Sequence, residues 1–86
     1  MASYEVVFAK SAVKELSDCP GHVAKRAKGA TDRLAKEPRH RGIVKLSGTS
    51  DLYRLRIGDY RFIYEIDDSQ HRVTILAVRH RREAYQ

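Results

Sequence analysis

The segment LYRLRIGDYRFIYEI, residues 52–66, constrains the fold more than any other part of the chain. Apolar and charged residues alternate in two runs, Leu52–Ile57 and Tyr60–Ile66, and the dipeptide Gly58-Asp59 separates them. Successive side chains of a β-strand point to opposite faces of a sheet, and Gly-Asp is close to a hairpin-turn signature. The segment therefore predicts a β-hairpin with one buried face and one polar face.

The remaining segments predict an α+β fold. Ser11 can cap a first helix that Pro20-Gly21 ends, and a second helix is expected over about His22–Lys36. We expect a single domain, residues 1–86, with the order β-α-α-β-β-β: an N-terminal strand, two helices, an antiparallel meander and a short C-terminal tail or helix. Strands outside the hairpin are expected at Ser3–Ala9, Gly42–Leu46 and Arg72–Val78.

The second helix carries one apolar stripe. Val23, Ala27, Ala30 and Leu34 recur at intervals of three and four residues, so they share one side of a helix. Two consecutive helices should pack together on one face of the sheet. We expect them to contact the apolar side of the hairpin, which carries Tyr53, Leu55, Phe62 and Tyr64.

Three arginines, Arg54, Arg56 and Arg61, take the alternate positions and are expected on the opposite, open face. Neighbouring guanidinium groups repel each other, a cost that is tolerated mainly where an anion binds. For any one of them, an ordinary polar face is the alternative, because arginine stems cover apolar surface well. Together they favour a phosphate-binding site, to which the end of the last strand adds Arg79, His80, Arg81 and Tyr85.

The net charge of +6 is concentrated between residues 22 and 45, where eight lysines and arginines face two acidic residues. Such a basic surface suits a polyanion, and a solvated face that keeps a small protein soluble is the alternative. From residue 51 onward the chain has seven arginines and no lysine, and arginine is the side chain suited to bidentate phosphate contacts. Candidate residues for binding a polyanion such as RNA are Lys25, Lys28, Arg33, Arg39, Arg41 and Lys45.

Several classes of protein are disfavoured. A single cysteine, Cys19, excludes an intrachain disulfide, and the short apolar runs and the N-terminal segment predict neither a membrane span nor a signal peptide. We therefore expect a cytoplasmic protein. The four histidines are scattered and expected at the surface, so no metal site and no cofactor is expected.

A site of arginine, histidine and tyrosine can cleave RNA without a metal. The 2′-hydroxyl beside the scissile phosphate is a built-in nucleophile, and arginines can stabilise the charge of the transition state. The intrinsic pKa of His80 suits proton transfer to the leaving 5′-oxygen. Tyr85 could stack on a base or align the attacking hydroxyl.

Two stretches, YRLRIGDYRFIYEI and VTILAVRHRREAY, resemble the RelE/ParE superfamily of bacterial toxin–antitoxin toxins, and the likeness covers essentially the whole chain. The resemblance implies an mRNA interferase, a metal-independent endoribonuclease that cuts mRNA in the ribosomal A site and inhibits translation. It also implies a cognate antitoxin, through which alone the toxin contacts DNA. No membrane partner is expected, because the apolar runs are short.

By position, the resemblance assigns Arg61 to the scissile phosphate, Arg81 to charge stabilisation or the leaving group, and Tyr85 to stacking on the substrate. Arg54 and Arg56 stand where the best-studied RelE-type toxins carry lysines. An arginine effectively cannot lose its proton and act as a base. The base therefore stays open among Glu65, His80, Tyr85, or none beyond orientation and electrostatics.

Two other functions fit the same resemblance. One is a ParE-like inhibitor of DNA gyrase that has no nuclease chemistry. The other is a non-toxic family member that acts only as a co-repressor with its antitoxin.

Overall fold

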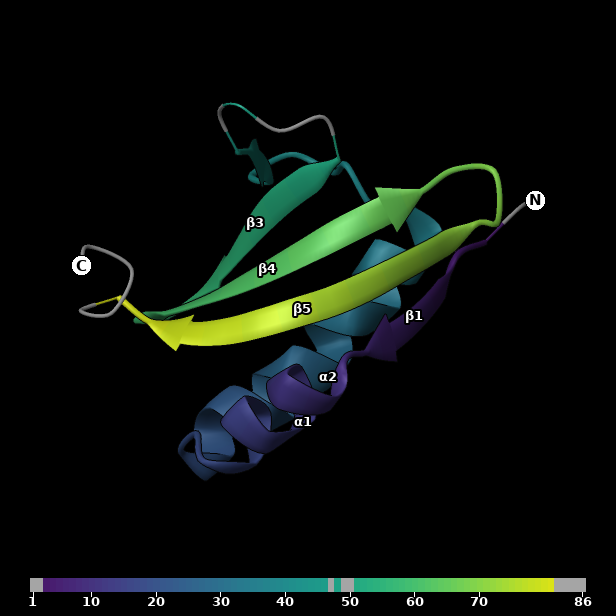
Figure 1. Cartoon of the computed structure of the whole chain (residues 1–86). Helices are drawn as coiled ribbons and strands as arrows, with labels where there is room; N and C mark the ends of the chain where they lie inside the picture. Colours follow the sequence, from purple (N-terminus) through teal and green to yellow (C-terminus); the bar gives the residue numbers. More distant parts are fainter. Residues whose placement is uncertain (1–2, 47, 49–50, 82–86) are drawn as a thin grey trace.

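The structure is a computed structural model that describes residues 3–46, 48 and 51–81. The expected order of elements is confirmed, and in Figure 1 both helices lie on one face of the sheet. Within the described residues, no helix is long and apolar enough to cross a membrane. The elements are β1 (Glu5–Phe8), α1 (Lys10–Ser17), α2 (Gly21–Lys36), β2 (Val44–Lys45), β3 (Leu52–Ile57), β4 (Tyr60–Asp67) and β5 (Arg72–His80).

The sheet has the strand order β1-β5-β4-β3-β2. β1 runs parallel to β5, and the other neighbours are antiparallel. The expected hairpin is formed by β3 and β4, and Gly58 in its turn has a φ of 60°, a left-handed conformation that glycine adopts without steric cost. The register pairs Arg56 with Arg61, and alternate residues of each strand point to opposite faces of the sheet.

The core lies between the sheet and the helices. Tyr53, Leu55, Phe62 and Tyr64 are buried on this side, as the alternation predicts. The hydroxyl of Tyr64 donates a hydrogen bond of 2.7 Å to the carbonyl oxygen of Pro38, and burial raises the pKa of this phenol, which keeps it protonated as a donor. The apolar stripe of α2 faces the same core, with Val23, Ala27 and Leu34 buried and Ala30 partly buried.

The start of α1 differs from the prediction. The N-cap is Ala9, not Ser11, and the helix begins at Lys10. The backbone N–H of Ala9 still donates 2.8 Å to Ile75 of β5, so the helix starts directly where the strand ladder ends. The hydroxyl of Ser11 instead donates 3.3 Å to the carbonyl oxygen of Leu76.

β5 contains a bulge at Leu76. Ile63 of β4 pairs with Ala77 and Tyr64 pairs with Ile75, so the ladder skips Leu76. An extra residue in one strand shifts the alternation of every side chain that follows it. Val78 is therefore buried on the helix side. In consequence Arg79 belongs to the open face.

Arg39 joins three distant parts of the chain. Its guanidinium donates 3.1 and 2.8 Å to the two carboxylate oxygens of Asp68 and 3.0 Å to the hydroxyl of Tyr53. Tyr4 donates 2.6 Å to Asp68 as well. The side chain predicted to bind RNA is thus engaged in a structural network. His40, predicted at the surface, is 6% exposed, and its Nδ1 lies 2.9 Å from the carbonyl oxygen of Arg41.

The Asp68 network predicts a defined loss of stability in acid. Hydrogen bonds from Arg39 and then Tyr4 lower the pKa of Asp68 to about 2, whereas an aspartate of an unfolded chain titrates near about 4. A depressed carboxyl pKa stabilises the fold above the unfolded pKa, and this contribution is lost as the pH falls from about 4 to about 2. Asp68→Asn should lower Tm at pH 7 and flatten Tm between pH 4 and 2.

Thermal unfolding from pH 7 to pH 2 measures this effect. Asp32→Asn is the matched control, because Asp32 is an exposed residue of α2 without an ion pair among the described residues. Equal acid sensitivity of wild type and Asp68→Asn would show that the network does not stabilise the fold.

Candidate phosphate-binding site

Three arginines form one row across the open face of the sheet. Arg56 of β3 pairs directly with Arg61 of β4, and Arg61 pairs directly with Arg79 of β5. Directly opposed residues of antiparallel strands have Cα atoms about 4.5–5.5 Å apart, with side chains on the same face. We call Arg56, Arg61 and Arg79 the arginine row. Arg54, two residues before Arg56, lies on the same face beside it.

The guanidinium groups of Arg56 and Arg79, the outer members of the arginine row, each have a partner outside the row. The Nε of Arg56 donates 2.9 Å to the carbonyl oxygen of Gly58 in the hairpin turn. The Nη1 of Arg79 forms an ion pair of 2.7 Å with Glu15 of α1. Arg61 stands half-buried between them. Three neighbouring guanidinium groups can bind the oxygens of one phosphate and stabilise added negative charge on it.

Arg81 follows β5 and is tied to the hairpin turn. Its backbone N–H donates 2.7 Å to the carbonyl oxygen of Asp59, and its Nη1 lies 3.8 Å from the Asp59 carboxylate. This contact brings Arg81 to the same end of the sheet as the arginine row. The structure thus brings Arg54, Arg56, Arg61, Arg79 and Arg81 to one end of the sheet.

Arg26 was not predicted as a site residue. A Cβ placed on Gly58 would lie 3.7 Å from Nη1 of Arg26, so this side chain of α2 reaches the hairpin turn. In the sequence, Arg26 contributes only one more charge to a basic helix, and its approach to the turn depends on how α2 packs under the sheet. Arg26 therefore places one charge of the basic helix next to the hairpin turn.

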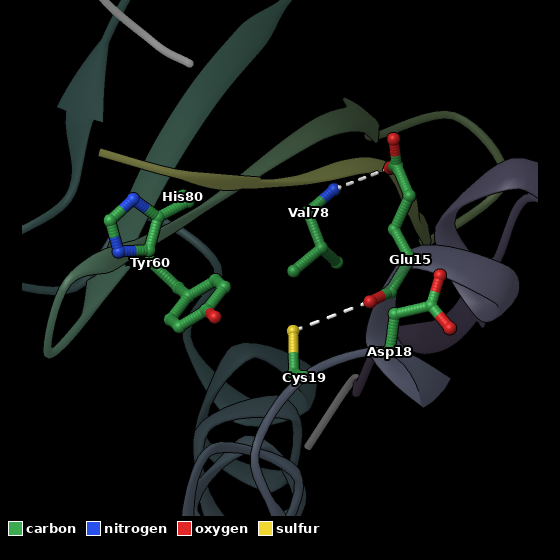
Figure 2. Close-up of a pocket in the computed structure, with 6 residues that line it drawn as sticks. All are labelled: Glu15, Asp18, Cys19, Tyr60, Val78 and His80. Carbon is green, nitrogen blue, oxygen red and sulfur yellow. Dashed lines mark hydrogen bonds between the residues drawn. The ribbon is translucent and has the colours of Figure 1, made fainter. Parts of the chain in front are cut away.

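His80 lies apart from the arginine row. It pairs with Tyr60 across the ladder, and the two rings meet edge to face with centroids 5.1 Å apart. Figure 2 shows both rings at a pocket of about 170 Å³ beside the C-terminal end of α1. The shift at Leu76 places His80 on this side. The other lining residues are Glu15, Asp18, Cys19 and Val78.

Glu65, another candidate base, lies away from the arginine row. Glu65 pairs with Leu52 and Thr74, and it lies four residues along β4 from Arg61, about 13 Å at the rise of a strand. Tyr85 lies outside the described residues.

Five of the basic residues predicted to bind a polyanion are exposed away from the arginine row. Lys25, Lys28 and Arg33 are exposed on α2, and Arg41 and Lys45 are exposed in the segment that leads from α2 to the hairpin. These five side chains remain available to a polyanion. Arg39 differs, because its guanidinium binds Asp68.

Comparisons with known proteins agree with the fold. The family described as the ParE toxin of type II toxin–antitoxin system, parDE, matches residues 6–85. Toxin RelE3 of Methanocaldococcus jannaschii is 32% identical over 94% of each chain. The RelE–RelB complex of Pyrococcus horikoshii OT3 has a TM-score of 0.82 at 37% identity, covering 94% of this chain and 97% of that chain.

A second solved structure, the toxin–antitoxin complex RelBE2 of Mycobacterium tuberculosis, has a TM-score of 0.80 at 34% identity and covers 94% of both chains. Sequence and fold agree over nearly the whole length of these relatives. The chain belongs to the RelE/ParE superfamily of toxins of type II toxin–antitoxin systems.

Proposed function

We propose that this toxin is a ribosome-dependent, metal-independent endoribonuclease that cleaves mRNA in the ribosomal A site, in the cytoplasm, and so inhibits translation. The observation that carries the proposal is the arginine row, a run of like charges on an open sheet face that suits the backbone of RNA. The names of the RelE relatives support the same branch of the superfamily. Among the described residues no group of three or more His, Cys, Asp or Glu could hold a metal ion.

The reaction would be an in-line transesterification. The 2′-oxygen of the nucleotide before the cut attacks phosphorus and loses its proton, the bond from phosphorus to the 5′-oxygen breaks, and the leaving oxygen takes up a proton. Arg61, in the centre of the arginine row, would hold the scissile phosphate, and Arg56 and Arg79 would stabilise the additional charge of the pentacoordinate transition state. Arg54 and Arg81 would hold the adjacent backbone.

The remaining question is which residues would transfer the protons of the reaction. Arg54 and Arg56 keep their protons, so they serve as electrostatic groups. Glu65 is disfavoured as the base by its distance along β4 from Arg61. His80 or Tyr85 would supply the acid, and His80 would have to act from the edge of the sheet, because its ring packs on Tyr60. Orientation of the 2′-hydroxyl and electrostatic stabilisation would then provide most of the rate enhancement.

A purified translation system programmed with one defined mRNA tests the proposal. We expect new 5′ ends at A-site codons only when ribosomes are present. Cleavage should persist when the toxin is treated with EDTA and then diluted into the translation system. Arg61→Met and Arg81→Ala should each lower the cleavage rate about 100-fold or more, because each removes a group that stabilises transition-state charge.

Arg72→Met is the matched control for the cleavage assay. Arg72 is an arginine of β5 that pairs with Glu5 at the opposite end of the strand. The Arg72→Met variant should cleave mRNA at the wild-type rate. Intact mRNA with wild-type toxin would contradict the proposal, and so would full activity of folded Arg61→Met.

We predict that replacing Arg61 raises the stability of the fold and lowers the cleavage rate, because Arg61 lies between two other arginines of the arginine row. Like charges directly opposed across strands destabilise a sheet by up to about 1 kcal/mol, and methionine keeps the apolar length of the side chain. Arg61→Met should raise Tm at low ionic strength by up to about 4–8 °C, and the gain should shrink in 1 M salt. Arg33→Met on α2, which lies outside the row, should show no such salt-dependent gain, and a fall in Tm of Arg61→Met would contradict the argument.

We propose that the basic face of α2 binds the RNA backbone of the ribosome, since Lys25 and Lys28 are exposed there. Lys25→Glu with Lys28→Glu should weaken ribosome binding and lower the slope of log affinity against log salt by about 1–2. Lys10→Glu with Lys14→Glu on α1 makes the same change of charge on another helix. Equal losses in both double variants would point to net charge instead of a specific surface.

A cognate antitoxin is the proposed protein partner, because the similar solved structures include RelE–RelB complexes. A segment that covers the arginine row should be acidic, so that its carboxylates take the place of phosphates. DNA would be contacted only through this antitoxin.

The second candidate function is a DNA gyrase inhibitor without nuclease chemistry. It is favoured by the family match, which is described as ParE toxin, and by Arg54 and Arg56, which replace the lysines of the best-studied RelE-type toxins. A supercoiling assay separates the two functions. Inhibited supercoiling together with intact mRNA would favour the gyrase inhibitor, and cleavage without inhibition would favour the ribonuclease.

A further inference from the structure

Helix α1 forms hydrogen bonds with β5 beyond the point where β1 stops pairing with this strand. The parallel ladder of β1 ends at the pair Phe8–Ile75. Beyond this pair, Ser11 of α1 donates 3.3 Å to the carbonyl oxygen of Leu76, and the backbone N–H of Val78 donates 2.9 Å to Oε1 of Glu15. Side chains at positions i and i+4 share one face of a helix. One face of α1 thus satisfies backbone groups that a longer β1 would otherwise have paired.

Glu15 contacts two consecutive residues of β5 with its two oxygens. Figure 2 shows the carboxylate reaching the backbone of Val78 through Oε1. The other oxygen, Oε2, lies 2.7 Å from Nη1 of Arg79. The side chain of Glu15 is 24% exposed, so water screens this ion pair less than it screens the 62% exposed Glu5 in its pair with Arg72. Glu15 is well placed to fix the direction of Arg79.

We propose that Glu15 is a positioning residue for the cleavage reaction, which acts by holding Arg79 at the outer end of the arginine row. The inference rests on the proposed function. Arg79 pairs directly with Arg61, so the two guanidinium groups repel each other. The ion pair with Glu15 offsets this repulsion at the edge of the sheet and limits the directions that the long side chain of Arg79 can take.

The geometry leaves Arg79 able to bind phosphate. A guanidinium has five N–H donors in a planar fork, and the contact with Glu15 involves Nη1. When the side chain of Arg79 is already oriented, less conformational entropy is lost as the transition state forms. Glu15 also belongs to α1, which is packed against β5 and is not part of the open face.

The test separates the charge of Glu15 from its hydrogen bond. In Glu15→Gln the side-chain amide oxygen can still accept the N–H of Val78, while the ion pair with Arg79 is lost. We expect the folded variant to lose about 10-fold in kcat with little change in KM for ribosomes. Glu5→Gln, which removes a glutamate–arginine pair at the other end of β5, should keep the wild-type kcat.

A double-mutant cycle shows whether Glu15 acts through Arg79. In an Arg79→Ala background, Glu15→Gln should change kcat by less than about 2-fold, because the partner of the lost charge is absent. A second 10-fold loss in that background would show that Glu15 supports the fold in general, and it would overturn the inference. Equal activity of wild type and Glu15→Gln would overturn it as well.

An NMR measurement tests the same inference without cleavage. In the isolated toxin, inorganic phosphate should shift the Nε–Hε signal of Arg79, and Glu15→Gln should reduce that shift several-fold while Glu5→Gln leaves it unchanged. An identical response in Glu15→Gln would overturn the positioning role. If wild-type toxin leaves mRNA intact, the proposed function fails, and this titration still decides whether Glu15 orients Arg79 toward an anion.

Discussion

The pairing of β4 with β5 decides which side chains share the open face. Up to Ile75 the buried residues of β5 occupy alternate positions, and the skipped residue Leu76 then reverses that alternation. Arg79 is thereby brought beside Arg61, while His80 turns to the pocket next to α1. With a regular ladder, a guanidinium would have entered the helix side and an imidazole the open face. One inserted residue therefore sets the composition of the site.

The sequence predicts the fold well because its signals are local. Alternation in the hairpin and the apolar stripe of α2 each depend on a few neighbouring residues, and both were confirmed, as was the placement of Arg54, Arg56 and Arg61 on one face. The exceptions depend on contacts between distant residues. The bulge at Leu76 reflects pairing with β4, and the ion pair of Arg39 joins residues 29 positions apart.

Arginine has two distinct uses in this chain, and the partner decides which one applies. Arg39 meets the carboxylate of Asp68 with two nitrogens, and it also packs over the ring of Tyr53 with 5.3 Å between the guanidinium carbon and the ring centroid. This arrangement uses the planar fork for structure. In the arginine row the residues directly opposite one another across the strands are all arginines, an arrangement suited to binding an anion. Composition alone cannot separate these uses.

The charges of the sheet are also separated along its length. A pocket of about 340 Å³ near the end of β4 is lined by Asp51, Glu65, Asp67 and Asp68, whereas the arginine row crosses the start of the same strand. Arg61 and Asp67 are six positions apart along β4, about 20 Å of extended strand. A polyanion that approaches the sheet is therefore attracted to one end and repelled from the other. Such a separation would orient a polyanion before any contact forms, which a uniform charge of +6 would not achieve.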